Sequence, residues 1–319
     1  ALGLVEQALQ VPGNDEQQAA LWEFASPAAA ALFRHEEGIE YAKQALEWYS
    51  TNGSPADVVR GAQVLGTAYV DADEPVSAVD AMEPHFDAGR AREPEMMALG
   101  AELSRAQMRS DQFQESADVA LAVLMAAEAT SNTPMAVEAM NTRGTVLGGL
   151  ARVYESIALL REALRLAEHH ALPYATLRAL NNLVVVEAAN GIAATRSSGV
   201  RGYELAQRVM HGGLLVRMAS NYAAGLMEDG SFDDAVAVLD GLDLGAESSW
   251  ANFFTAFVEV VRWIQSGDQA HIVRAREANR PALDHPEPQY RSGAIDNEVT
   301  LRWICLLYTS DAADDSVYV

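Results

Sequence analysis

Polar side chains recur along this chain at a fixed spacing that could support recognition of a peptide. Three asparagines follow one another at intervals of 40 residues: Asn141, Asn181 and Asn221. A carboxamide both donates and accepts hydrogen bonds, so a row of them can pair with the backbone of an extended peptide. The spacing therefore predicts a ladder of amides that binds a peptide chain.

Arginines accompany this predicted ladder. Arg178 lies four residues before Asn182, and Arg217 lies four residues before Asn221, so each pair shares one face of a helix. A guanidinium group presents forked donors that bind a carboxylate or a phosphate. Three further polar residues extend the same predicted wall: Arg60, Gln63 and Arg105.

A second interpretation of these residues is purely structural. An asparagine in the middle of a helix can hydrogen-bond a neighbouring helix, and an arginine beside it can simply solvate the surface of an acidic protein. The sequence leaves the peptide groove and the structural role as alternatives.

Sequence patterns typical of catalysis are missing from the chain. It has no Gly-x4-Gly-Lys phosphate loop and no His-Glu-x-x-His zinc motif. His169 and His170 are adjacent, so on a helix they point about 100° apart and are poorly placed to chelate one metal. We therefore expect no catalytic residue, no cofactor and no metal site, and no enzymatic activity in this chain.

The elements that must position these residues are indicated by two periodic markers. Prolines recur at intervals of 39, 40 and 39 residues: Pro55, Pro94, Pro134 and Pro173. Small residues or threonine recur in step with them: Gly38, Ala78, Ser116, Ser156, Thr195 and Ala235. Two markers with one period of this length predict a stacked array of repeats.

Each repeat is predicted to hold two helices, which we call helix A and helix B. In the second repeat Ser54 and Pro55 are typical of a helix start, and Pro75 opens the next helix. Pro27 and Pro84 fall inside expected helices and should kink or shorten them. The fifth repeat is irregular, with a predicted loop at 191–199. No segment alternates as a strand would, so the fold class is all-α.

The repeats resemble the tetratricopeptide repeat (TPR). The motif begins with Leu65-Gly66-x-x-Tyr69, with Ala78 twelve residues after Gly66, and a similar run begins at Tyr222. The resemblance implies an α-solenoid, a right-handed superhelix of antiparallel helix pairs whose helices A line the concave surface. It covers about seven to eight units within residues 1–304, although the period of 39–40 exceeds the usual 34. It also implies a protein or peptide as partner.

Composition narrows the classes of partner. The formal net charge is −23, which argues against binding of nucleic acid or an anionic membrane, since both require positive surface. No apolar run approaches the ~20 residues needed to span a bilayer. We expect a cytoplasmic protein that binds no nucleic acid and no membrane.

Longer, degenerate repeats of this kind are similar to the regulatory arrays of large bacterial signalling proteins. Glu36-Glu37-Gly38-Ile39 and Gly202-Tyr203-Glu204-Leu205 are typical of STAND-class ATPases, LuxR-type activators and ATPase-linked adenylate cyclases. The resemblance implies a protein-binding or peptide-binding region of a multidomain regulator. A free-standing TPR adaptor or peptide sensor is the alternative, and an enzyme built on an α-solenoid, whose acidic groups act on a cationic substrate, is the third hypothesis.

The end of the chain has a different origin in this interpretation. Residues 305–319, which begin Cys305-Leu306-Leu307-Tyr308, resemble the translation of a sequencing adapter, an artefact of metagenomic assemblies. The chain also begins with Ala1. We therefore expect a non-native tail at 305–319 and a fragment of a longer protein.

Overall fold

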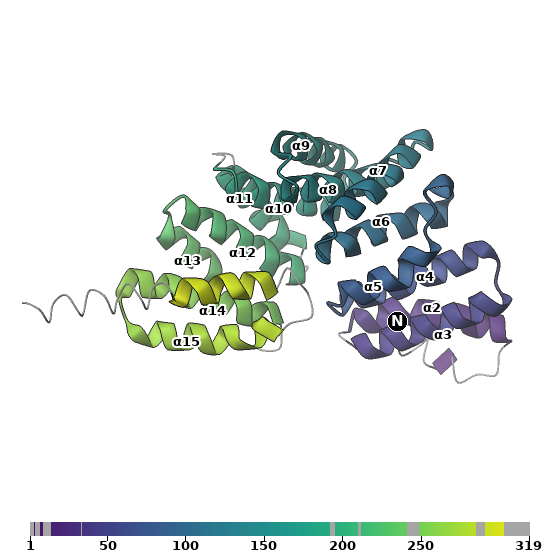
Figure 1. The fold of residues 1–319 in the computed structure, drawn as a ribbon, viewed down its shortest axis with the longest axis horizontal. Coiled ribbons are helices and arrows are strands. Elements are labelled where there is room, and N and C mark those ends of the chain that lie inside the picture. The colour runs from purple at the N-terminus through teal and green to yellow at the C-terminus, as the bar shows by residue number, and fades with distance from the viewer. Residues whose placement is uncertain are drawn as a thin grey trace, which may run out of the picture. The chain divides into compact units, whose positions relative to one another are not determined.

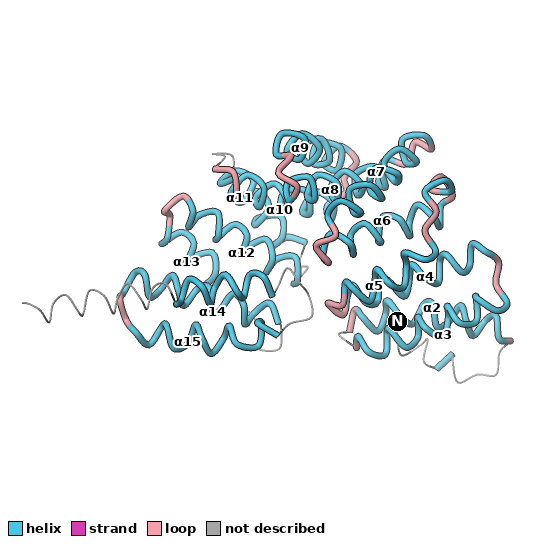
Figure 2. Tube along the Cα trace, viewed as in Figure 1, coloured by secondary structure: helices cyan, strands magenta, loops and turns pink. Residues whose placement is uncertain are grey.

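The computed structural model of the chain describes residues 14–32, 34–191, 195–209, 212–240, 249–284 and 291–302, together with Gly3, Gln7 and Ala8. Every regular element within these residues is helical, and no strand occurs among them (Figures 1 and 2). Successive helices pack as antiparallel pairs, which confirms the predicted all-α solenoid. The predicted tail at 305–319 lies outside the described residues.

The helices alternate between the two positions of the repeat. The helices A are α2 (Asp15–Ala30), α4 (Pro55–Asp71), α6 (Pro94–Arg109), α8 (Thr133–Gly149), α10 (Pro173–Ala188), α12 (Gly212–Glu228) and α14 (Ser249–Ser266). The helices B are α3 (His35–Asn52), α5 (Pro75–Met82), α7 (Phe113–Ala129), α9 (Val153–His169), α11 (Thr195–Val209), α13 (Phe232–Asp240) and α15 (Gln269–Asn279). Three short 3-10 helices, at Glu83–His85, Ala88–Arg90 and Arg280–Asp284, and a helical segment at 291–302 complete the described elements.

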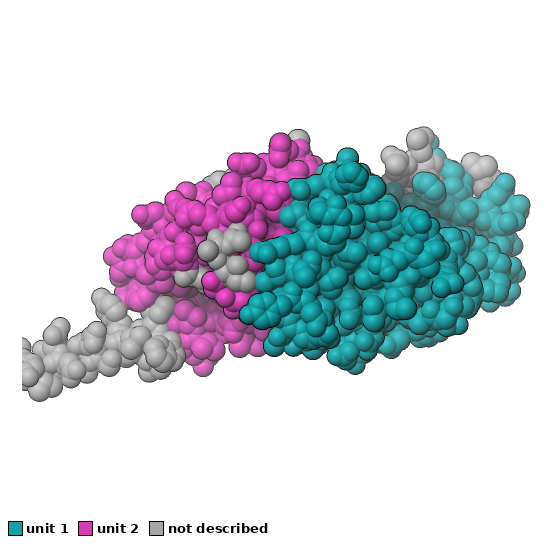
Figure 3. Space-filling view, turned by 90° about the horizontal axis from the view of Figure 1, so that it is seen from above, with its two compact units in different colours: residues 1–179 teal, residues 180–319 magenta. Residues whose placement is uncertain are grey.

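The chain divides into two compact units, residues 1–179 and 180–319, and the boundary falls inside α10 (Figure 3). In unit 1 each helix A packs against its own helix B, and α4 also packs against α2 and α6. In unit 2, α12 packs against α11, α13 and α14, and α14 packs against α15. Each unit is thus built from contacts between neighbours along the chain, as expected for repeats.

The proline ladder marks the starts of the helices A, as predicted. Pro55, Pro94 and Pro173 are the first residues of their helices, and Pro134 is the second residue of α8. Ser54 closes a reciprocal capping box with Asp57, because the Ser54 N–H donates to Asp57 Oδ2 at 2.8 Å and the Asp57 N–H donates to Ser54 Oγ at 3.3 Å. Proline tolerates this position since the first helical N–H has no partner inside the helix.

The small-residue ladder falls on the fourth residue of the helices B, with one correction. Gly38, Ala78, Ser116, Ser156 and Ala235 each hold that position. In α11 the fourth residue is Ser198, which is buried, whereas Thr195 begins the helix. The prediction missed this because the connection from α10 to α11 spans residues 189–194, against 150–152 between α8 and α9. Residues 195–199 of the loop predicted at 191–199 belong instead to α11.

Small residues are needed because helices A and B cross closely at this point. Ser116 Oγ donates to the Ser104 carbonyl at 2.7 Å, directly across the pair. A Cβ added at Gly144 would lie 2.7 Å from Leu160 Cγ, and one at Gly66 would lie 2.3 Å from Met82 Sδ. Larger side chains at these glycines would force the helices apart.

Proline shortens one helix B, as the sequence predicted. α5 ends at Met82, and Pro84 lies in the 3-10 turn that follows. Pro27 lies within the last turn of α2, which ends at Ala30. Both positions agree with the absence of a proline N–H and the clash of its ring with the preceding turn.

The turns from helix A to helix B share one backbone conformation. A residue with positive φ follows each helix A from α4 to α14: Asp73 (59°), Asp111 (60°), Ala151 (59°), Gly191 (62°), Gly230 (77°) and Gly267 (70°). After several of them the next N–H donates five residues back, as from Glu74 to the Tyr69 carbonyl at 2.9 Å and from Ser231 to the Leu226 carbonyl at 2.8 Å. These are Schellman motifs, in which a left-handed residue satisfies the last carbonyls of the helix.

Candidate functional site

Polar residues recur along one face of the helices A of unit 1, and ion pairs on this face join α2 to α4 and α8 to α10. We call this surface the helix-A face of unit 1 and define it by the residues at helical spacing on α4, α6, α8 and the start of α10. They are Arg60, Gln63, Thr67, Asp71, Glu102, Arg105, Glu138, Thr142 and Arg178, with Glu23 and Asp57 as ion-pair partners of Arg60. All of the predicted groove residues in this unit except Asn141 lie on it.

The three asparagines of the predicted ladder lie between neighbouring helices. Asn141 is 0% exposed, and its Nδ2 donates to the Ala175 carbonyl of α10 at 3.3 Å. Asn181 is 7% exposed, and its Oδ1 accepts from Nδ2 of the half-buried Asn221, on α12, at 3.0 Å. These are the contacts of the structural alternative, while contact with a peptide stays a prediction for these residues.

Asn182 differs from its neighbour in the use of its amide. It is half-buried, and its Oδ1 accepts from Asn181 Nδ2 at 3.3 Å. Its own Nδ2 donates to no group in the part of the chain that the structure describes. Asn182 therefore keeps two N–H donors for an external acceptor.

The predicted arginines of α10 and α12 have partners inside the chain. Arg178, whose side chain is 11% exposed, forms an ion pair with Glu138 on α8, one repeat earlier. Its second terminal nitrogen lies 3.4 Å from Thr142 Oγ1. Arg217 is half-buried on α12 and also interacts within the chain.

Arg60 and Gln63 lie on the first part of the helix-A face. Arg60 binds Glu23 of α2 at 2.8 Å and Asp57 of its own helix at 2.8 Å, and its guanidinium lies over the Tyr49 ring at 5.2 Å. Gln63 Nε2 donates to Thr67 Oγ1 at 3.1 Å on the next turn of α4. The arginine therefore joins α2 and α4, whereas the bonds of the glutamine to described residues lie within its own helix.

Arg105 lies among carboxylates from α4 and α6. It forms an ion pair with Glu102 on its own helix, and its charge also acts on Asp71 at the end of α4. Asp71 keeps an exposed surface, yet the protein atoms crowded around its carboxyl group displace enough water to raise its pKa. The negative charge of Glu102 raises that pKa further, while Arg105, His35 and Arg109 act to lower it. The net shift is upward, so Asp71 is poorly compensated as a carboxylate.

Sequence reasoning did not find the three buried charged residues, Arg109, Glu187 and Glu259, and the first is a cation in unit 1. The Arg109 side chain is 7% exposed, and it donates to Asp73 Oδ1 at 2.7 Å and to the Val70 carbonyl at 2.8 Å, which fastens α6 to the turn after α4. The 36-residue separation of Arg109 and Asp73, close to one repeat, is a signal that a search for charge pairs at the repeat period could have used.

In unit 2 the buried charged residues that the structure describes are both acidic, Glu187 and Glu259. The Glu259 side chain on α14 is 7% exposed and binds Arg262, His271 and Arg274, with its Oε2 lying 2.6 Å from Arg274 Nε. Burial alone would raise the pKa of Glu259, but the hydrogen bonds from these three residues lower it. A carboxylate buried in this way is stabilised by its donors.

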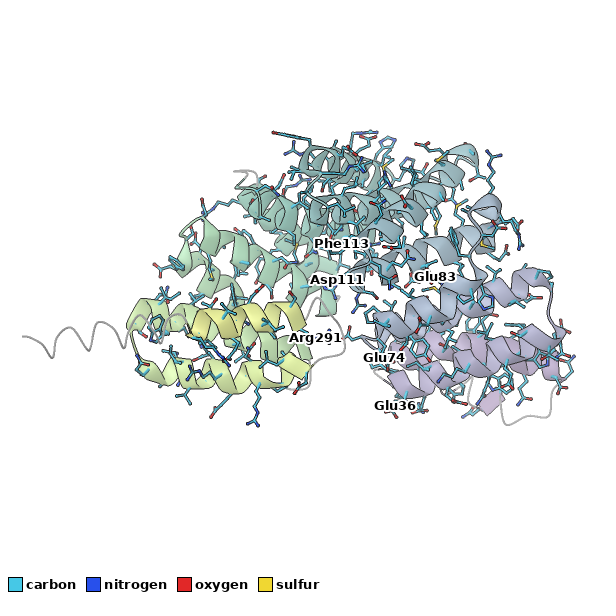
Figure 4. All side chains as sticks on the ribbon, in the orientation of Figure 1. Glu36, Glu74, Glu83, Asp111, Phe113 and Arg291 are labelled. Carbon is cyan, nitrogen blue, oxygen red and sulfur yellow. The ribbon has the colours of Figure 1, made fainter. Side chains whose placement is uncertain are left out.

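A cleft of about 500 Å³ lies where α3 begins beside the turn between α4 and α5, next to the Asp71 end of the helix-A face. Its lining includes Glu36 and Glu74, which are labelled in Figure 4. No residue of the predicted groove lines it.

Among the described residues there is no group of three or more His, Cys, Asp or Glu arranged for a metal ion. Within the same residues, no helix combines the length and apolarity required to cross a bilayer.

Several solved structures share this fold. A Rap protein complexed with Competence and Sporulation Factor is 12% identical with a TM-score of 0.63, over 93% of this chain and 80% of that one. A tetratricopeptide repeat protein from Parabacteroides merdae is 12% identical with a TM-score of 0.52, over 88% of this chain and 99% of that one. The TPR-like repeats of a Podosopora anserina kinesin light chain are 15% identical with a TM-score of 0.50, over 62% and 99%. No protein-family model and no curated protein matches the sequence. At such identities the likeness shows the fold, a TPR-like α-solenoid.

Proposed function

We propose that this chain is a protein-binding or peptide-binding scaffold that contacts its partner through the faces of its helices A. The fold supports this proposal, since a similar array, the Rap protein, is complexed with Competence and Sporulation Factor. Repeat arrays offer extended surfaces suited to a chain-like partner. The proposal assigns no reaction to this chain, and no nucleic acid or membrane.

The observation that carries the proposal is the unused amide of Asn182. Its two N–H donors lie half-buried on a helix A, with no acceptor inside the described residues. A half-buried donor of this kind gains by meeting the carbonyl of an extended peptide, about 0.5–1.5 kcal/mol for one hydrogen bond. Asn181 and Asn221 fix the amide network behind it, since each is bonded to a neighbour in the same unit.

The proposed surface keeps the residues that the sequence predicted, assigned to each unit separately. In unit 2, Asn182 and Asn221 contact the peptide backbone, Asn181 holds α10 and α12 in register, and Arg217 adds a polar group on the same helix as Asn221. In unit 1, Asn141 holds α8 and α10 in register, and the polar surroundings come from Arg60, Gln63, Arg105 and Arg178. Because Asn141 and Asn181 are buried, we propose that they support binding by holding neighbouring helices in place. The half-buried amides of Asn182 and Asn221 support it by contacting the peptide.

Selection from a displayed library of random dodecapeptides tests the proposal. We expect peptides that bind the chain, and we expect Asn182→Ala to weaken them at least about fivefold with an unchanged melting temperature, by loss of one or two hydrogen bonds. Asn190→Ala is the matched control. Asn190 is exposed just after α10, the helix that carries Asn182, and its Nδ2 already donates to the Val186 carbonyl. Failure to enrich any peptide, or equal binding to the two variants, would contradict the proposal.

We further propose that the scaffold is the repeat region of a multidomain bacterial regulator, which transmits the bound state to an ATPase, cyclase or DNA-binding domain. The support is the similarity of its degenerate repeats to such regulatory arrays. A longer sequence of the same locus is the test. A phosphate loop upstream or a helix-turn-helix downstream is expected, and an isolated open reading frame would instead indicate a free-standing adaptor.

A further inference from the structure

We propose that the helix-A face of unit 1 selects a cationic partner, an extended peptide segment that carries lysine or arginine. This inference rests on the proposed peptide-binding function and specifies the chemistry of the ligand. It concerns unit 1 alone, and it follows from how the charges of this face are paired.

The arginines of the face are already neutralised. Arg60 is bound by Glu23 and Asp57, Arg105 by Glu102, and Arg178 by Glu138. An anionic ligand would have to displace a carboxylate held in place by the fold, with no net gain of charge pairing. The face is therefore poorly suited to a carboxylate or a phosphate, although its arginines alone suggested those ligands.

The balance of charge on the face is negative. Five carboxylates lie on this face or bind its arginines: Glu23, Asp57, Asp71, Glu102 and Glu138. Three guanidinium groups face them, on Arg60, Arg105 and Arg178, while the charge of Arg109 near Asp71 is matched by its own partner, Asp73. The face thus keeps an excess of negative charge, in a protein whose net charge is already −23. Such a field attracts cations and raises their rate of association.

The excess is located at Asp71. Its carboxylate has no ion pair and no side-chain hydrogen bond within the described part of the chain, although Arg105, Glu102, His35 and Arg109 surround it. Asp71 is an exposed residue, so an ammonium or guanidinium group that reached its partly desolvated carboxylate would supply the missing partner. Thr67 and Gln63 lie one and two turns earlier on α4, so they can accompany a peptide backbone along the helix.

The direct test compares two fluorescent decapeptides of glycine and serine that are identical except for three lysines or three glutamates. Binding to the whole chain is measured by anisotropy at about 0.05 and 0.15 M salt. We expect the lysine peptide to bind at least about tenfold more tightly and to lose affinity at the higher salt. Equal binding of the two peptides would overturn the charge inference and leave the peptide-binding function standing. Binding of neither peptide would overturn the inference and count against the function as well.

A single substitution separates this site from the general field of an acidic protein. Asp71→Asn should weaken the lysine peptide about fivefold, and it should not lower the melting temperature because Asp71 gives up no ion pair. Asp80→Asn, an exposed position on helix B α5, makes the same change in net charge and should change binding less than about twofold. Equal losses in the two variants would show that the attraction comes from net charge and that Asp71 is not the contact. Tighter binding of a single-stranded oligonucleotide than of the lysine peptide would also overturn the inference.

Discussion

The two units differ in the residues that end their helices A and in the sign of their buried charged residues. In unit 1 the left-handed residues that end the helices A are Asp73, Asp111 and Ala151, whereas in unit 2 they are glycines. Among the described residues, the buried charged residue of unit 1 is basic, Arg109, while those of unit 2 are acidic, Glu187 and Glu259. The shared backbone turn is therefore a requirement of the repeat, and the residue that adopts it is a local choice.

That choice has a structural consequence in unit 1. A side chain in the left-handed region costs roughly 1–2 kcal/mol compared with the ordinary helical region. Asp73 accepts this strain and in return provides the carboxylate that binds Arg109. A glycine at that turn would relieve the backbone but leave the buried guanidinium without its ion pair. Unit 1 thus couples its turn to the next repeat through a side chain.

The largest effect is expected from Arg109→Met, which removes the coupling and keeps the length of the side chain. We expect a loss of about 2–4 kcal/mol, because Asp73 and the Val70 carbonyl lose charge-assisted hydrogen bonds in a buried setting. Amide hydrogen exchange would show the loss in unit 1. The exposed pair of Arg165 and Glu162 is the control, since Arg165→Met should change stability by under about 0.5 kcal/mol. Equal exchange in the two variants would contradict the assigned role of Arg109.

Acid should affect the stabilising contribution of the buried Glu259 in a defined direction. The pKa of Glu259 is lower in the folded state than the ordinary 4.5, so its contribution is complete above about pH 4.5 and is lost as the pH falls through the folded value. Glu259→Gln should therefore destabilise unit 2 by about 1–3 kcal/mol at pH 7 and by progressively less on acidification. Thermal melts of both proteins between about pH 3 and pH 7 measure this. If the stability difference between the two proteins grew toward low pH, the pKa of Glu259 would be raised by folding and the prediction would be wrong.

Exchanging the turn residues tests the comparison directly. Gly230→Ala places a Cβ at a φ of 77°, where no neighbouring atom lies within 4 Å, so the whole effect is backbone strain. We expect a loss of about 1–2 kcal/mol. Denaturant unfolding followed by hydrogen exchange in unit 2 is the measurement.

The control for Gly230→Ala is the opposite substitution, alanine to glycine, made inside a helix. Ala237→Gly, at an exposed position in the middle of α13, should also cost about 0.5–1 kcal/mol, because alanine is the better residue there. A loss of stability in both variants would show that the backbone conformation decides whether glycine or alanine is preferred. No loss in Gly230→Ala would mean that the turn relaxes without strain.

The reverse exchange in unit 1 should give the smallest effect and the opposite sign. Ala151 has a φ of 59° at the turn after α8, and Ala151→Gly should stabilise the chain by about 0.5–1 kcal/mol. The gain is smaller than the strain removed, because glycine also increases the entropy of the unfolded chain. A melting temperature that falls would indicate that the Ala151 methyl group makes a packing contribution.

The sequence predicted the repeat well because the marker residues have strict local requirements. Proline fits the first turn of a helix and little else in a helix, so the proline ladder located the starts of four helices A. The small residues were equally informative in five of the helices B. In α11 the longer connection at 189–194 places Ser198, and not Thr195, at the fourth position of the helix. A period measures distance along the chain and cannot show where additional residues are accommodated.

The candidate site was predicted less completely, and the reason is geometric. Spacing of 40 residues places Asn141, Asn181 and Asn221 at similar positions of successive helices, but it does not tell which side of a helix A meets its neighbour. The structure places Asn181 in the seam and Asn182, the next residue, with unused donors. Similarly, composition could not show that each arginine of the helix-A face is bound by a carboxylate.

The polar bonds that join neighbouring repeats span nearly equal lengths of chain. Arg60 and Glu23 are 37 residues apart, Arg109 and Asp73 are 36 apart, and Arg178 and Glu138 are 40 apart. None of these three bonds requires a residue that is synthesised more than about one repeat later. On the ribosome, each newly emerged helix pair can therefore bind a folded predecessor at once, and the array can grow from its first repeat outward without waiting for its last.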